Sequence, residues 1–169
     1  RDTATAHERL FFIEVMGRHS GFIAIMTSIA GGAEEVLVPE EECDIPTIAK
    51  RLELAKSRGK TSMIVIIAEG DEQGNAFTVA KKVAEITDFK DSRVSVVGHM
   101  QRGGSPTAFD RILASRMGVR AVEALLEGET GMMVGIENQG LVLHPLSAAW
   151  ETKSLFSPDL LRVSRLLAT

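Results

Sequence analysis

Two short, almost wholly apolar runs constrain the fold of this chain more than any other feature of its sequence. They occupy residues 10–16 (LFFIEVM) and 62–68 (SMIVIIA), and aromatic and β-branched side chains are frequent in them. A near-continuous apolar run of about 4–8 residues is typical of a strand that is buried on both faces of a parallel sheet. The chain must therefore supply helices that cover both faces of this sheet.

Segments with helical periodicity separate and follow these runs. Residues 18–30 place apolar side chains at helical spacing and end at Gly31 and Gly32, which suit a helix C-terminus. Ser105, a good N-cap residue, and Pro106 at the first helical position mark the start of a long helix. We also predict strands at residues 35–38 and 93–97, weaker strands at 132–136 and 141–144, and helices at 45–57, 75–86 and 158–167.

The alternation of strands and helices predicts an α/β protein with three layers (α/β/α) around a mainly parallel sheet. In such folds ligands bind beyond the carboxyl ends of the strands. The residues that directly follow each strand are therefore the candidates for a functional site.

Composition and charge narrow the possible partners. The formal net charge of −4 implies no broad basic surface for nucleic acid or anionic lipid. Cys43 is the only cysteine, which excludes an internal disulfide and favours a reducing cytoplasm. No apolar run approaches the roughly 18–20 residues of a membrane span. We expect a cytoplasmic protein with neither a nucleic-acid nor a membrane partner and, because no histidine pair has metal-ligand spacing, no metal ligands in this chain.

Polar side chains that suit a phosphorylated ligand follow three of the predicted strands. Arg18 follows the first run, Glu69 follows the second, and His99 and Arg102 follow the third strand. Glycines beside arginines let backbone N–H groups approach an anion, while guanidinium groups bind phosphate oxygens in bidentate fashion. Glu69 adds an acceptor for sugar hydroxyls. Each residue alone is also explained by a solvated or structural side chain, but together they indicate a sugar phosphate.

Five segments of the chain resemble motifs of the phosphofructokinase family, in the order and spacing of that family. They are RDTATAHER (1–9), EVMGRHSG (14–21), GAEEVLVPE (32–40), IIAEG (66–70) and GHMQRGGSPTAFDRILASRMG (98–118). The resemblance extends to about residue 146. It implies transfer of a phosphoryl group to the 1-hydroxyl of fructose 6-phosphate, which gives fructose 1,6-bisphosphate in glycolysis.

The resemblance also implies roles for individual residues. The sugar-phosphate ligands would be Met16, Gly17, Arg18, Glu69, His99 and Arg102, with Arg18 as the catalytic residue beside the transferring phosphoryl group. Arg9 and Arg93 would reach the 6-phosphate bound by a neighbouring subunit. We therefore expect a homo-oligomer with shared sites, a tetramer of the bacterial type.

An effector site between subunits is a further implication of the resemblance. The matching positions are Arg1, Glu34, Arg58 and Lys60, and the effector would be a nucleoside diphosphate or phosphoenolpyruvate. Arg58 stands where a lysine is common in the family, so the identity of the effector and the presence of allostery stay open. A solvated charge cluster at the turn of residues 58–60 is the alternative.

In this family the glycine-rich ATP loop and the aspartate that accepts the sugar's hydroxyl proton lie upstream of the matching segments. Neither occurs here, and the chain begins with Arg1, so we interpret it as a C-terminal half that is inactive alone. Mg²⁺ with ATP would be the cofactor of the complete enzyme, although the donor, ATP or pyrophosphate, is not fixed by these residues. A non-catalytic regulatory module that binds a sugar phosphate is the alternative function.

The resemblance further divides the chain into three segments. Residues 1–100 would form the small sugar-phosphate lobe, and residues 101–149 would return to the large lobe. Residues 150–169 would cross back and end in a helix.

Overall fold

The computed structural model describes residues 9–89, 91–151 and 156–168. The chain divides into two compact units, Arg1–Arg102 with Leu155–Thr169, and Gly103–Ser154. Each unit is described by itself below. The assignment of residues 1–100, 101–149 and 150–169 to the lobes of a larger protein stays a prediction.

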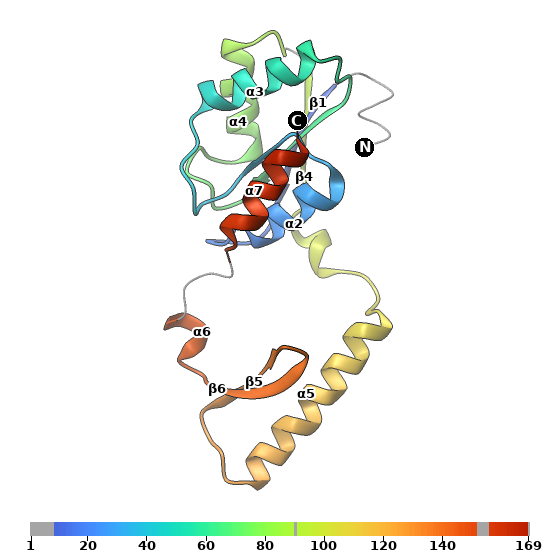
Figure 1. The fold of residues 1–169 in the computed structure, drawn as a ribbon, viewed down its shortest axis with the longest axis vertical. Helices are drawn as coiled ribbons and strands as arrows, with labels where there is room; N and C mark the ends of the chain where they lie inside the picture. The colour runs from blue at the N-terminus through green and yellow to red at the C-terminus, as the bar shows by residue number, and fades with distance from the viewer. Residues whose placement is uncertain (1–8, 90, 152–155, 169) are drawn as a thin grey trace. The chain divides into compact units, whose positions relative to one another are not determined.

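A parallel four-stranded sheet lies at the centre of the first unit (Figure 1). Its strands are β1 (Leu10–Val15), β2 (Glu35–Leu37), β3 (Met63–Ala68) and β4 (Ser92–Val96), in the order β2-β3-β1-β4. In the register of β1, Leu10 lies beside Met63 on one side and Ser92 on the other. The two apolar runs are thus the two central strands, as the sequence predicts.

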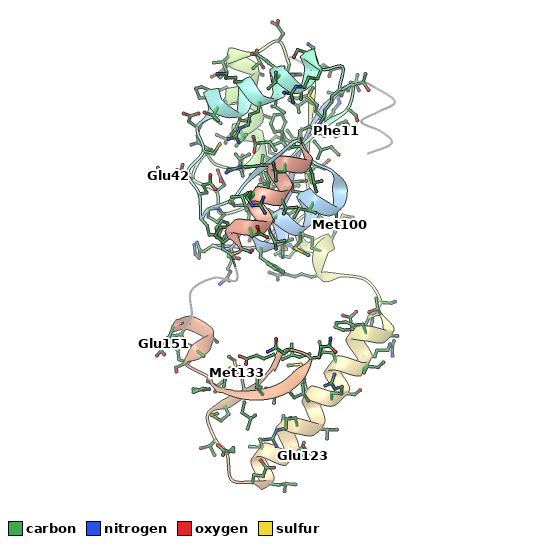
Figure 2. The ribbon with its side chains drawn as sticks, viewed as in Figure 1. Phe11, Glu42, Met100, Glu123, Met133 and Glu151 are labelled. Atoms are coloured by element: carbon green, nitrogen blue, oxygen red, sulfur yellow. The ribbon has the colours of Figure 1, made fainter. Side chains whose placement is uncertain are left out.

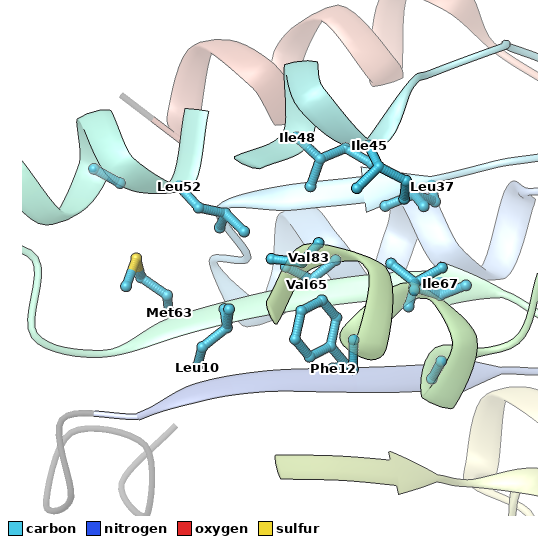
Figure 3. Packing of buried hydrophobic residues seen from close by; sticks show 14 residues of the cluster. Leu10, Phe12, Leu37, Ile45, Ile48, Leu52, Met63, Val65, Ile67 and Val83 are labelled. Atoms are coloured by element: carbon cyan, nitrogen blue, oxygen red, sulfur yellow. The ribbon is translucent and has the colours of Figure 1, made fainter. Parts of the chain in front are cut away.

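Helices cover both faces of this sheet. They are α2 (Phe22–Gly31), α3 (Ile45–Ser57), α4 (Ala76–Ile86) and α7 (Pro158–Leu167). Helices α3 and α4 bury their apolar sides in one core, shown in Figure 3, and α2 and α7 contribute to a second core. The predicted three-layer α/β/α architecture is confirmed.

The two central strands divide their side chains between these cores with a period of two. In β1, Phe12 enters the core beneath α3 and α4, whereas Val15 enters the core beneath α2 and α7. In β3, Val65 enters the core beneath α3 and α4, and Ile66 enters the core beneath α2 and α7. Phe12 and Val65 are completely buried, and each such side chain stabilises the fold by about 1.5–3 kcal/mol relative to exposure. This burial on both faces explains why neither strand shows a polar alternation.

Polar caps fix where two of the helices begin. The Asp44 carboxylate accepts a hydrogen bond from the Thr47 N–H at 2.7 Å, at the start of α3. The Asn75 side chain accepts one from the Thr78 N–H at 2.9 Å, at the start of α4. Each cap satisfies a backbone donor that has no partner inside the helix.

The second unit contains α5 (Ala108–Leu126), the antiparallel pair β5 (Met132–Glu137) and β6 (Gly140–Pro145), and α6 (Ala148–Glu151). The predicted helix start at Ser105 and Pro106 is wrong. Thr107 is the N-cap instead, because its hydroxyl accepts from the Asp110 N–H while the Asp110 carboxylate accepts from the Thr107 N–H. This reciprocal capping box satisfies two backbone donors at once.

The apolar stripe of α5 is exposed rather than packed within this unit. Phe109 is 69% exposed and Leu125 is 68% exposed, and Ala124 is the buried residue of the helix. Side chains of this unit therefore leave most of the apolar side chains of α5 uncovered. No helix among the described residues is both long enough and apolar enough to cross a membrane.

Candidate functional site

Three loops meet beyond the carboxyl ends of β1, β3 and β4. The paired positions at these ends are Val15 beside Ala68, and Glu14 beside Val96. The sheet hydrogen bonds continue one residue further, because the Glu69 N–H donates to the Val15 carbonyl at 3.0 Å and the Val97 N–H donates to the Glu14 carbonyl at 3.0 Å. The residues that follow all three strands are consequently neighbours in space.

Glu69 joins the loop after β3 to the loop after β1. Its Oε1 accepts hydrogen bonds from the Arg18 N–H at 2.8 Å and the Gly17 N–H at 3.3 Å. These two backbone donors, the Arg18 N–H first, lower the pKa of the Glu69 carboxyl, and the positive charges of Arg102 and Arg18 lower it further. The structure thus joins Glu69 to the turn of Arg18, the charge of Arg102 acts on the same carboxylate, and the carboxylate is ionised at neutral pH.

The turn that carries Arg18 has an unusual backbone. Arg18 adopts φ of 50°, in the left-handed region that side chains other than glycine rarely occupy. The Ser20 N–H closes the turn by donating to the Gly17 carbonyl at 2.9 Å. Such strain persists where surrounding groups hold it, and it is frequent at functional sites.

Gly70 makes a close contact with this turn that the sequence analysis missed. A Cβ atom placed on Gly70 would lie 1.9 Å from the Arg18 carbonyl oxygen. No side chain fits at this position while the turn keeps its place. Glycine at residue 70 was the available signal, because glycine is required where backbone segments approach closely.

Gln101 is a second residue that the sequence analysis did not assign to the site. It lies in the 3₁₀ turn η1 (Gly98–Arg102), which follows β4. Its Oε1 accepts a hydrogen bond from the Met16 N–H at 2.8 Å. The same turn presents His99, Met100 and Arg102 at the surface, and Met100, labelled in Figure 2, is 83% exposed.

Arg9 and Arg93 do not lie in this cluster. Arg9 precedes β1 and Arg93 is the second residue of β4, so both are at the amino ends of their strands. A six-residue strand such as β1 separates its ends by about 20 Å. Asp91 pairs with both arginines, with its Oδ2 2.8 Å from the Arg9 Nε and its Oδ1 3.1 Å from the Arg93 Nη1.

Three of the predicted effector residues line one cavity of about 220 Å³, together with Arg51 and Arg165. Glu34 is almost buried, and its Oε2 accepts from the Ile64 N–H at 2.6 Å. The Lys60 Nζ lies 3.8 Å from the Glu34 Oε1 and donates to the Ala168 carbonyl. Arg58 borders the cavity at the C-terminus of α3.

The fourth predicted effector residue, Arg1, lies outside the described residues. Within the ranges that the structure describes, no group of three or more histidine, cysteine, aspartate or glutamate side chains is arranged to hold a metal ion.

The fold and the candidate site define an α/β protein of the class that binds ligands beyond the carboxyl ends of parallel strands. The chain belongs to the phosphofructokinase family, whose sequence profile, described as Phosphofructokinase, matches residues 1–125. It is 49% identical over 168 residues to the ATP-dependent 6-phosphofructokinase of Bacillus cytotoxicus. It is 52% identical over 168 residues to ATP-dependent 6-phosphofructokinase 1 of Thermus thermophilus. These alignments cover 99% of this chain and 52% of each relative, so the chain spans about half the length of the curated relatives it matches.

Solved structures of phosphofructokinases share the fold of this chain. A phosphofructokinase structure from Saccharomyces cerevisiae matches with a TM-score of 0.79 and 32% identity, over 89% of this chain and 21% of that one. A pyrophosphate-dependent phosphofructokinase from Marinobacter aquaeolei matches with a TM-score of 0.77 and 21% identity, over 96% of this chain and 50% of that one. At this lower identity the second match shows the shared fold alone.

Proposed function

We propose that this chain forms the fructose 6-phosphate-binding part of an ATP-dependent 6-phosphofructokinase, a cytoplasmic kinase of glycolysis. One observation carries the proposal: the segments that carry Arg18, Glu69 and Arg102 follow three adjacent strands at their carboxyl ends, and the Glu69 carboxylate accepts from the Arg18 N–H. The two curated relatives, 49% and 52% identical to this chain, are named ATP-dependent, which favours ATP over pyrophosphate as the phosphoryl donor.

The chemistry of phosphoryl transfer fits these side chains. It depends mostly on positioning and on neutralising charge on the transferring group. Arg18 lies on a turn whose backbone is hydrogen-bonded to Glu69, and its guanidinium group would stabilise that charge. Substitution of Arg18 should therefore lower turnover most. Glu69 accepts from backbone donors through Oε1, which fixes its carboxylate, and its other oxygen would accept from the hydroxyls of a bound sugar. His99 and Arg102, with the backbone of Met16 and Gly17, would bind the rest of the substrate.

Arg9 and Arg93 fit a role toward a neighbouring copy. They lie at the amino ends of their strands, away from the cluster, and share the Asp91 carboxylate. A phosphate group could replace Asp91 as their partner, because guanidinium groups bind both anions in the same geometry. We propose a homotetramer in which these arginines complete the site of another subunit.

The cavity lined by Glu34, Arg58 and Lys60 supports the proposed effector site. Arg58 and Lys60 are two of its four basic lining residues, with Arg51 and Arg165, and they suit the phosphate of a nucleoside diphosphate or of phosphoenolpyruvate. The Lys60 contacts to Glu34 and the Ala168 carbonyl would have to rearrange when an anion binds. Allosteric control through this cavity is part of the proposal.

Mg²⁺ with ATP would supply the phosphoryl group in the complete enzyme. The described residues offer no ligand set for the metal, and Glu69, the carboxylate of the cluster, already accepts from two backbone donors. We therefore assign no metal ligand among the described residues. Their part is to bind and orient the sugar phosphate and to place Arg18.

Titration calorimetry of this chain with fructose 6-phosphate tests the proposal. We expect saturable binding, and Arg102→Ala should weaken it about tenfold, the equivalent of one charge-assisted hydrogen bond. Arg162→Ala is the matched control, because Arg162 is an exposed arginine that pairs with Asp159, and it should bind like the unsubstituted chain. The absence of saturable binding would refute the assignment.

A non-catalytic sugar-phosphate-binding module is the second candidate function. To separate the two, the chain can be joined to the amino-terminal half of the Thermus thermophilus relative. The kinase proposal expects this hybrid to form fructose 1,6-bisphosphate from ATP, with a turnover that Arg18→Ala depresses. Binding of fructose 6-phosphate without any turnover by the hybrid would favour the module.

A further inference from the structure

We propose that Gln101 is a positioning residue that holds the turn carrying Arg18 in its reactive place. The inference rests on the proposed function, because it gives Gln101 a role through Arg18 rather than through the substrate. Its basis is the hydrogen bond from the Met16 N–H to the Gln101 Oε1 at 2.8 Å, which joins residues 85 positions apart.

The hydrogen bond replaces a missing step of the β-sheet ladder. Glu14 pairs with Val96, and the Val97 N–H donates to the Glu14 carbonyl. In a regular parallel ladder the Met16 N–H would donate next to the Val97 carbonyl. That carbonyl instead accepts from the Met100 N–H at 3.3 Å, inside η1. The Gln101 side chain therefore provides the acceptor that the backbone of β4 no longer offers.

Three residues, Gln101, Glu69 and Gly70, contact the turn that carries Arg18, and they do so from two sides. Glu69 accepts from the N–H groups of Gly17 and Arg18, and Gly70 approaches the Arg18 carbonyl. Both of these come from the loop after β3. Gln101 supplies the contact from the β4 side, at the residue where the turn leaves β1. Without it, the strained left-handed conformation of Arg18 is held from one side only.

The expected consequence is specific to the group that Arg18 contacts. In the proposed function Arg18 sits beside the phosphoryl group that is transferred to the 1-hydroxyl. Fructose 1,6-bisphosphate carries this group and fructose 6-phosphate lacks it. The ratio of the two affinities therefore reports the placement of Arg18, whereas a general loss of folding would weaken both ligands alike.

Gln101→Met tests the inference, because methionine has a similar length and no comparable acceptor. Calorimetry of this chain should show a bisphosphate-to-monophosphate affinity ratio about fivefold lower in Gln101→Met, on the order of one lost hydrogen bond. In an Arg18→Ala background, Gln101→Met should leave the ratio unchanged, since coupled residues give non-additive effects. Hydrogen exchange should quicken at residues 16–18 and stay constant in β3.

Each other outcome has a distinct meaning. An unchanged ratio in Gln101→Met, or an equal additional loss in the Arg18→Ala background, would overturn the inference while the proposed function stands. Loss of the cooperative thermal transition in Gln101→Met would show a role in folding instead and would overturn it as well. If the unsubstituted chain binds neither sugar phosphate, the proposed function fails, and the inference fails with it.

Discussion

Replacing Gly70 with alanine should displace the turn that carries Arg18. The added Cβ would lie 1.9 Å from the Arg18 carbonyl oxygen, and separations under 3.0 Å are not tolerated. The turn must therefore withdraw by about 1 Å, a misplacement that can cost on the order of 100-fold in an active site. Gly70 lies outside the left-handed region, so alanine adds a steric effect and no conformational strain of its own.

This displacement would break the contacts that hold the turn. The Arg18 N–H lies 2.8 Å from the Glu69 Oε1, and a further 1 Å or so would exceed hydrogen-bonding distance. We expect Gly70→Ala to lower the affinity for fructose 1,6-bisphosphate tenfold or more, as measured by calorimetry. The free energy of unfolding should fall by about 1–3 kcal/mol, the usual cost of an overpacked contact.

Gly31→Ala is the control for this prediction. A Cβ at Gly31 would meet nothing within 4 Å, and the residue ends α2 outside the left-handed region. Alanine there should leave ligand affinity unchanged and stabilise the fold by up to about 1 kcal/mol. If Gly70→Ala binds the bisphosphate as tightly as Gly31→Ala does, the close approach of Gly70 to Arg18 is refuted.

Three further substitutions test the fold. Phe12→Ala should lower the free energy of unfolding by about 3–5 kcal/mol in denaturant titrations, because the ring is completely buried; a loss below about 1 kcal/mol would contradict the packing. Burial raises the pKa of the Asp71 carboxyl, so ionisation of this group opposes folding. Asp71→Asn should therefore raise the melting temperature at neutral pH, and this gain should vanish below the ordinary pKa of aspartate. A gain that stays undiminished at such low pH would refute the reasoning. Thr107→Ala should reduce the helicity of α5, at a cost of about 1 kcal/mol for the lost capping box, as circular dichroism would show; unchanged helicity would argue against Thr107 as the cap.

The central strands and the convergence of the site could be predicted from the sequence for one physical reason. A strand buried on both faces must be apolar throughout, so residues 10–16 and 62–68 were recognisable without any partner. Parallel strands place their carboxyl ends at one edge, so Arg18, Glu69 and Arg102 were expected at the same edge once the sheet was predicted.

Two of the remaining features depend on contacts between segments that are distant in the sequence. Gln101 enters the site because the Val97 carbonyl turns into η1, and Gly70 enters because two loops approach each other. The start of α5 was wrong by two residues because the capping box of Thr107 and Asp110 prevailed over the signal from Ser105. The first two outcomes require the coordinates of more than one segment, whereas the Thr107-x-x-Asp110 pattern was present in the sequence and was missed.

Arg18 and Arg102 follow the carboxyl ends of the strands, whereas Arg9 and Arg93 lie at their amino ends. This arrangement has a consequence for oligomers that contain two different variants. If Arg18 acts in its own site while Arg9 serves the site next door, two different defective copies can repair each other. In the hybrid with the amino-terminal half of the Thermus thermophilus relative, copies with Arg18→Ala and copies with Arg9→Ala would each lose activity when assembled separately. When mixed, some sites would combine the intact Arg18 of one copy with the intact Arg9 of another, and activity would return. A site built within a single copy would show no such complementation.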